Sequence, residues 1–128
     1  MSPSRYSTGW VRLCALAVLL GLGLMACGKK APDAIAPDNA ADQVGGLFDQ
    51  SPPDVKALAD RAVEAMASEN LPRAHLLLQT LMARTDLTPE QRDVVTGAFV
   101  GVGERLRESA SSGDEKAQEF QRLHQSSK

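Results

Sequence analysis

An uncharged apolar run near the start of the chain constrains where the protein is located and how it can fold more than any other feature. Residues 13–24 carry no charge and are rich in leucine, and the charged side chains before them are Arg5 and Arg12. A basic start followed by an apolar run of this length is typical of a secretory signal peptide. Twelve helical residues span roughly 18 Å, too short for a hydrocarbon core of about 30 Å. The run therefore predicts export rather than a membrane-spanning helix.

The apolar run is followed by a cysteine in a recognisable setting, Leu24-Met25-Ala26-Cys27. This sequence resembles the lipobox of bacterial lipoproteins, in which a branched apolar, a variable and a small residue precede a cysteine. The resemblance implies that the Cys27 sulfur receives a diacylglycerol and that the signal is cut just before it. Cys27 is thus the predicted lipid-attachment residue, and a membrane is the predicted partner. The alternative is an ordinary signal peptide with a chance cysteine.

The anchor also bears on localisation. Each buried methylene contributes about 0.8 kcal/mol, so the two or three acyl chains implied for Cys27 would make attachment effectively permanent. Gly28 is not the aspartate that retains many such lipoproteins in the inner membrane. The resemblance therefore implies the outer membrane of a bacterial envelope, facing the periplasm. In a cell with a single membrane, the domain would face outside.

The remaining chain is short and mildly acidic. From Cys27 onward it has 102 residues, with 12 basic and 16 acidic side chains. That length allows one small domain. A net charge of −4 argues against nucleic acid as a partner. The aromatic residues left are Phe48, Phe99 and Phe120, too few for a base-stacking surface. Cys27 is the one cysteine left, so the chain cannot form an internal disulfide.

Composition divides the chain into three parts: a signal peptide over residues 1–26, a lipidated tether over 27–50 and a helical domain over 51–128. Prolines and a Gly-Gly pair are expected to keep the tether flexible. If flexible, its typical end-to-end distance is roughly 26 Å. Leu47-Phe48 is too apolar for a pure linker and can dock on the domain.

Apolar residues of the domain recur at three- and four-residue spacing, and no segment alternates with period two. This pattern predicts an all-α fold, a small antiparallel hairpin or bundle of three to four helices after a disordered tether. Ser51 is the expected N-cap of the first helix. Thr88, with Gln91 three residues later, predicts a capping box for the third. A short last helix is expected near the C-terminus.

Small residues in the first two helices resemble the pattern of a tetratricopeptide repeat. Ala62, Ala65 and Ala74 match its close-contact and core positions, and Leu78 and Leu81 match later core positions. A shift of 34 residues, the repeat length, places Thr96 on Ala62 and Phe99 on Ala65. The resemblance implies a hairpin of the tetratricopeptide type followed by the start of another. A plain three- or four-helix bundle is the alternative.

Candidate chemical groups are few. His75 and His124 lack the spacing of a metal site or a catalytic motif, and we interpret each as a surface or helix-edge histidine. Glu64 and Glu69 are the carboxylates that could partner His75. Asp60 and Glu64 lie one helical turn apart, as solvated charges commonly do.

Three glycines, Gly97, Gly101 and Gly103, have the wrong order for a dinucleotide-binding loop. We expect them instead to let a neighbouring helix approach closely. No catalytic residue, cofactor or metal is predicted.

The sequence thus favours a membrane-anchored, non-enzymatic interaction or scaffolding module that binds an envelope protein or a second copy. Leu76, Met82 and the face of residues 120–123 are the expected contact surface. Two alternatives remain open. One is an envelope small-molecule-binding protein or hydrolase that uses His75, and the other is a spacer or surface protein without a defined partner.

Overall fold

The computed structural model describes residues 31–127, which fall within the compact unit Pro32–Lys128 apart from Ala31. This part of the chain contains five α-helices and no strand. They are α2 (Pro37–Phe48), α3 (Pro53–Ala67), α4 (Leu71–Met82), α5 (Pro89–Ser111) and α6 (Glu115–Ser126). The predicted signal peptide and the predicted lipid-attachment residue Cys27 lie outside the described residues. The all-α prediction is confirmed here, with one helix more than expected.

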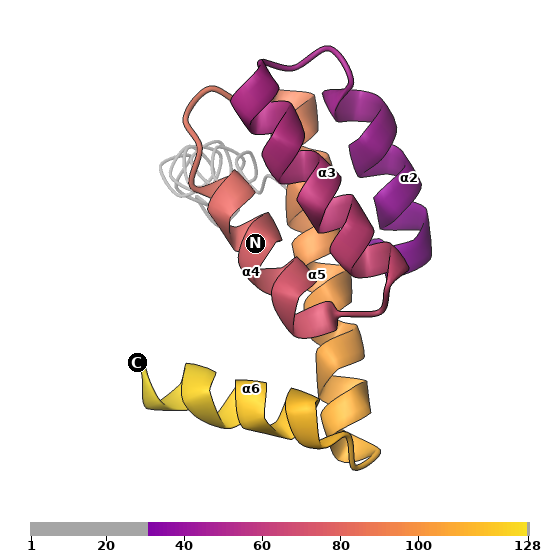
Figure 1. Cartoon of the computed structure of the whole chain (residues 1–128), viewed down its shortest axis with the longest axis vertical. Coiled ribbons are helices and arrows are strands. Elements are labelled where there is room, and N and C mark those ends of the chain that lie inside the picture. The colour runs from indigo at the N-terminus through magenta and orange to yellow at the C-terminus, as the bar shows by residue number, and fades with distance from the viewer. Residues whose placement is uncertain (1–30, 128) are drawn as a thin grey trace, which may run out of the picture. The chain divides into compact units, whose positions relative to one another are not determined.

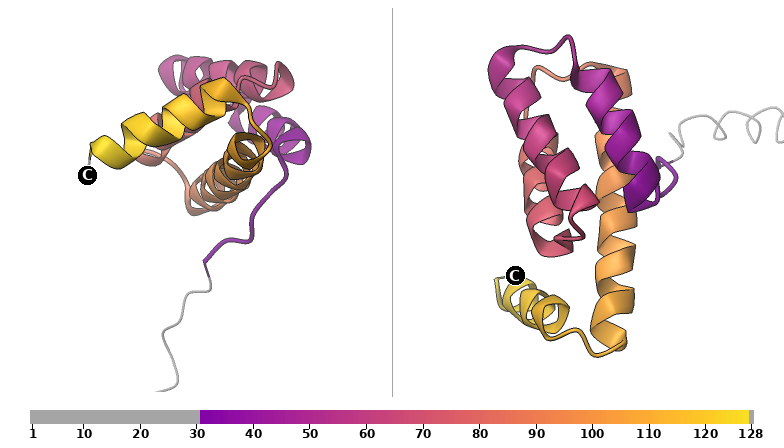
Figure 2. Two further views of the ribbon diagram at one scale, coloured as in Figure 1. Left: turned by 90° about the horizontal axis from the view of Figure 1, so that it is seen from below. Right: turned by 45° about the vertical axis from the view of Figure 1, so that its right-hand side comes forward.

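Four of the helices pack as a closed ring (Figures 1 and 2). Each of α3, α4 and α5 packs on the helix before it, and α5 also packs on α2. The connections are short, so successive helices run in opposite directions. Helix α6 packs mainly on α5, with a smaller contact to α4, and runs across the end of the ring.

Helix α2 occupies residues for which the sequence predicts a flexible tether, and the prediction is wrong for this segment. Pro37 stands in the first turn, where its missing N–H costs no hydrogen bond, so it starts a helix rather than breaking one. Ala40, Val44 and Phe48 then lie one turn apart and are fully buried. Burying side chains such as valine and phenylalanine contributes about 1.5–3 kcal/mol each, which outweighs about 1 kcal/mol for each helical glycine.

The starts of the other helices follow local signals. Thr88 and Gln91 form the predicted capping box, with hydrogen bonds of 3.1 Å and 3.0 Å between each side chain and the other's backbone N–H. At α4 and α6, the side chains of Asn70 and Asp114 each accept one hydrogen bond from a backbone N–H of the first turn. The expected N-cap role of Ser51 is wrong, because Pro52 stands at that position. The Ser51 hydroxyl instead accepts a hydrogen bond from the Gln91 amide at 2.9 Å.

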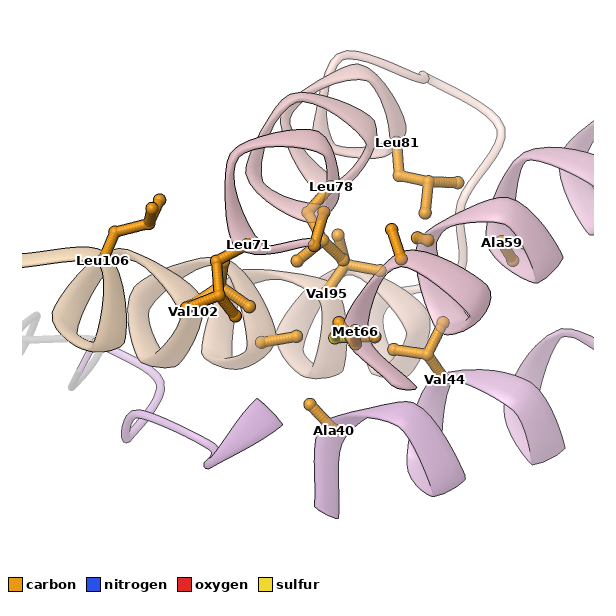
Figure 3. Packing of buried hydrophobic residues seen from close by; sticks show 14 of the residues in the cluster. Ala40, Val44, Ala59, Met66, Leu71, Leu78, Leu81, Val95, Val102 and Leu106 are labelled. Atoms are coloured by element: carbon orange, nitrogen blue, oxygen red, sulfur yellow. The ribbon is translucent and has the colours of Figure 1, made fainter. Parts of the chain in front are cut away.

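The core lies inside the ring and draws on all four of its helices (Figure 3). Val44, Met66, Leu78 and Val95 are among its fully buried members, one from each helix. Ala59, Ala62 and Ala74 fill the narrow contacts between helices. Small residues at these positions bring the helices close together without leaving a cavity.

An extended segment, residues 33–35, lies along α5 and is called the strap below. The Ile35 amide donates a hydrogen bond to the Gly97 carbonyl oxygen at 3.0 Å. A Cβ atom at Gly97 would lie 2.8 Å from the Asp33 carbonyl oxygen, and one at Gly101 would overlap the Ile35 carbonyl. The glycines do permit a close approach, but the neighbour is an extended segment and not the expected helix.

No helix within residues 31–127 is long and apolar enough to cross a membrane.

Candidate functional site at the junction of α4, α5 and α6

The structure buries His75, contrary to its interpretation as a surface or helix-edge residue. The side chain leaves α4 and is 8% exposed. Phe99 from α5 lies against it with ring centroids 4.2 Å apart, and Phe120 from α6 meets it edge-on at 5.4 Å. The local pattern around residue 75 does not show this, because the covering rings come from helices that follow much later in the chain.

His124 completes a cluster of four rings, which we call the aromatic junction: His75, Phe99, Phe120 and His124. The His124 ring stacks on Phe120 and lies edge-on to His75, with centroids 5.9 Å away in both cases. His124 itself is exposed. It stands in the last turns of α6, so its neighbours are set by the angle at which α6 leaves α5.

A small cleft of about 360 Å³ opens beside the aromatic junction. Arg107 lines it from α5, and Gln121 and Gln125 line it from α6. A Cβ at Gly103 would lie 3.8 Å from the His75 Nε2 atom, an ordinary van der Waals distance. The packing around His75 therefore does not require a glycine at this position.

Burial makes the neutral form of His75 the favoured one. Desolvation lowers the pKa of His75 first, and the nearby His124 lowers it further. The Nδ1 atom is buried and has no hydrogen-bond partner. Glu64 and Glu69 are exposed, and no hydrogen bond in the described part of the chain joins either of them to His75. The imidazole thus lacks the carboxylate partner that commonly orients a histidine base.

A wider, shallow groove of about 960 Å³ separates α6 from the end of the ring. Apolar Met66, Leu71 and Phe120 line part of it, and charged Arg105 and Glu108 stand among its other lining residues. Within residues 31–127, no group of three or more histidine, cysteine, aspartate or glutamate side chains is arranged to hold a metal ion.

Two large apolar side chains are well exposed: Leu76 on α4 at 51% and Leu123 on α6 at 64%. Met82 and Phe120, named with them as contact candidates, are only partly exposed because they also pack on the core. The predicted apolar surface is therefore present in part. The aromatic junction was not predicted as a cluster. The signal for it was the spacing of Phe120 and His124, one helical turn apart on the same face.

Other charged residues pair on the surface. Lys56 binds Asp49 at 3.0 Å and Asp60 at 3.3 Å, so Asp60 is a paired surface charge. Arg84 bridges Asp54 and Asp86 at 2.7 Å and 2.6 Å and lowers the pKa of Asp86. The pair between Arg84 and Asp54 connects the start of α3 with the loop after α4.

No protein-family model, curated protein or solved structure matches the chain.

Proposed function

We propose that this chain is a lipoprotein of the bacterial envelope, lipid-anchored through Cys27, whose helical domain binds another envelope protein. The anchor rests on the apolar run and the Leu24–Cys27 pattern. The binding role rests above all on Leu123, whose side chain is mostly exposed. Leu123 lies one helical turn from the partly exposed Phe120, and contiguous exposed apolar surface marks contact sites.

Because the strap packs on α5, only the residues between Cys27 and Asp33 separate the proposed anchor from the folded domain. Asp33 is six residues after Cys27, so the intervening chain spans at most about 20 Å when fully extended. A partner of this domain is accordingly expected at or near the membrane. By the resemblance to lipoproteins and by Gly28, we propose the outer membrane, with the domain facing the periplasm.

For the finer fold we favour the plain bundle over the tetratricopeptide-like arrangement. Repeats of that kind stack so that each contacts its neighbours and the array stays open. Here α5 returns to α2, so the four helices enclose one core. A concave groove for a bound peptide inside the ring is therefore not part of the proposal.

The alternatives have weaker support. A hydrolase using His75 would need a group that orients the imidazole, and Arg107 and His124 are the ionisable side chains lining the cleft with it. A small-molecule-binding protein has only the cleft beside His75 in its favour. A spacer without a partner would tolerate every surface substitution, including those at Leu76 and Leu123.

Two experiments test the proposal. The first compares intact mass and membrane partition of the wild type with a Cys27→Ala variant. We expect lipid mass on the wild type and an uncleaved precursor for the variant. A soluble, unlipidated wild type would refute the anchor.

The second places a photo-crosslinking amino acid at Leu123 or Leu76, with the exposed Arg61 position on α3 as the matched control. We expect a discrete cross-linked protein from the leucine positions and not from the control. Equal cross-linking from all three positions would refute a contact surface at the leucines.

A further inference from the structure

Helix α6 is held to the rest of the domain at few points. Ala117 is its one buried residue. Near its start, the Gln118 amide donates to the Ala110 carbonyl at 3.0 Å, and Asp114 caps the first turn. The chain turns from α5 into α6 at Gly113, whose φ of +98° only glycine adopts readily. Farther along α6, the ring contacts of Phe120 and His124 with His75 join it to α4.

These contacts depend on a neutral His75. A protonated imidazole carries N–H groups on both nitrogens, and the Nδ1 atom is buried with no acceptor. The faces of Phe99 and Phe120 attract a cation weakly, but a ring face does not replace an oxygen acceptor for that N–H. A proton on His75 is thus poorly accommodated while α6 is docked.

The charged groups that face His75 add to this cost. Arg107 from α5 and His124 from α6 line the same cleft, and both are basic. Helix α3, which packs on α4, contributes no residue to the cleft, and among the described residues no carboxylate lines it. A positive His75 would therefore meet positive neighbours and no counter-charge.

We propose that His75 is an acid-sensitive latch: neutral, it holds α6 against α4 through the aromatic junction, and protonated, it releases α6 while the four-helix ring stays folded. Gly113 is the hinge on which α6 moves. Release uncovers Phe120, the residues that line the groove between α6 and the ring, and the end of α4. An envelope protein exposed to external acid would then change its contact surface. This inference does not depend on the identity of a partner.

The direction of the pH effect follows from the lowered pKa of His75. The released state has the ordinary histidine pKa of about 6.5 and binds a proton more readily than the docked state. Docking is therefore fully stable above that pH and weakens as the pH falls below it. At pH 5 the docking equilibrium falls by up to about thirty-fold from His75 alone, the limit in which the docked form takes no proton.

The test follows the full chain in detergent micelles by NMR, with ¹³C and ¹⁵N labels, from pH 7.5 to pH 5.0. Cross-relaxation between the His75 and Phe120 rings reports docking, and the amide signals of α2 to α5 report the ring. We expect the ring-to-ring signal to weaken progressively below about pH 6.5, most strongly at pH 5.0, while the amide signals of α2 to α5 stay in place. An unchanged signal at pH 5, or loss of the whole domain with it, would overturn the proposal.

Three variants separate His75 from other titrating groups. His75→Phe keeps a ring of similar size without a titratable nitrogen, and we expect its α6 to stay docked at pH 5. His75→Gln, also without an ionisable group, serves if the larger ring is not accommodated. His124→Phe removes the ionisable ring that faces His75 but keeps a ring to stack on Phe120, and we expect its α6 still to be released at pH 5. Release of α6 in His75→Phe with the wild-type pH profile would show that His75 is not the latch.

Discussion

The amide nitrogen of Ile35 lies 3.0 Å from the carbonyl oxygen of Gly97 and donates a hydrogen bond to it. An extended segment just after the proposed lipid anchor is thus joined to the middle of the longest described helix. The contact requires Gly97 and Gly101, because side chains there would occupy the space of the strap. The glycines weaken α5 as a helix, but they allow the strap to pack against it.

Gly101→Ala is expected to destabilise the domain although alanine is the better helix former. Its Cβ would overlap the Ile35 carbonyl, a backbone group, so the strap or α5 must move. We expect a loss of about 1–3 kcal/mol in the free energy of unfolding, as for overpacked sites. Urea unfolding followed by circular dichroism measures it.

Gly103→Ala, two residues on, is the matched control. Its Cβ would meet His75 at an ordinary distance, so we expect no loss and a gain of up to about 1 kcal/mol. Equal effects of the two substitutions would contradict the strap contact.

Phe48→Ala tests whether α2 belongs to the fold. Phe48 is fully buried, so its truncation is expected to cost about 3–5 kcal/mol in the free energy of unfolding. On the same helix, the exposed Gln43→Ala should change stability by no more than about 0.5 kcal/mol. If Phe48 lay in a flexible tether, both variants would unfold at the wild-type denaturant concentration. Chemical denaturation of the two variants beside the wild type decides this.

Thr88→Ala is expected to lower the free energy of unfolding by about 1 kcal/mol, because it leaves the Gln91 amide without its capping acceptor. Thr85→Ala removes the same hydroxyl from an exposed loop position and serves as the control. Denaturant midpoints of the two variants give the comparison. A Thr88 variant as stable as the control would show that the capping box does not contribute measurably.

The free energy of unfolding of the whole domain should also depend on the protonation of His75. The pKa of His75 is lowered in the folded protein, so the unfolded chain takes up the proton first and stability falls below about pH 6.5. Between pH 7.5 and pH 5 we expect the wild type to lose up to about 2 kcal/mol more than His75→Phe. The carboxylates titrate alike in both proteins, so their contribution cancels in the difference. Equal losses in the two proteins would show that His75 stays neutral or is equally easy to protonate in both states.

Much of the helical architecture was predictable because its signals are local. The Thr88–Gln91 capping box depends on four consecutive residues, and the apolar spacing in α3 and α4 repeats within a few turns. Local signals gave the wrong prediction for α2, because its prolines and glycines are typical helix breakers and therefore favoured a flexible tether. Pro37 lies where proline starts a helix, and the burial of Val44 and Phe48 by α3 and α5 outweighs the glycines.

The candidate site was far less predictable. Its neighbours in sequence place His75 at the edge of the apolar face of α4 and therefore predict an exposed side chain. Its burial depends on Phe99, 24 residues later, and on Phe120, 45 residues later, and the latter arrives there through the turn at Gly113. Such contacts join residues far apart in sequence, and no spacing rule within one helix reports them.

By itself, the sequence determined that residues 51–127 form helices without strands and where most of these helices begin, because caps and apolar periodicity act over a few residues. It also carries the whole argument for the lipid anchor at Cys27, which lies outside the described residues. The tertiary structure decided that α2 closes a ring, that the strap uses Gly97 and Gly101, and that His75 is buried under α6. Those features depend on side chains brought together from distant parts of the chain, where burial outweighs local preference.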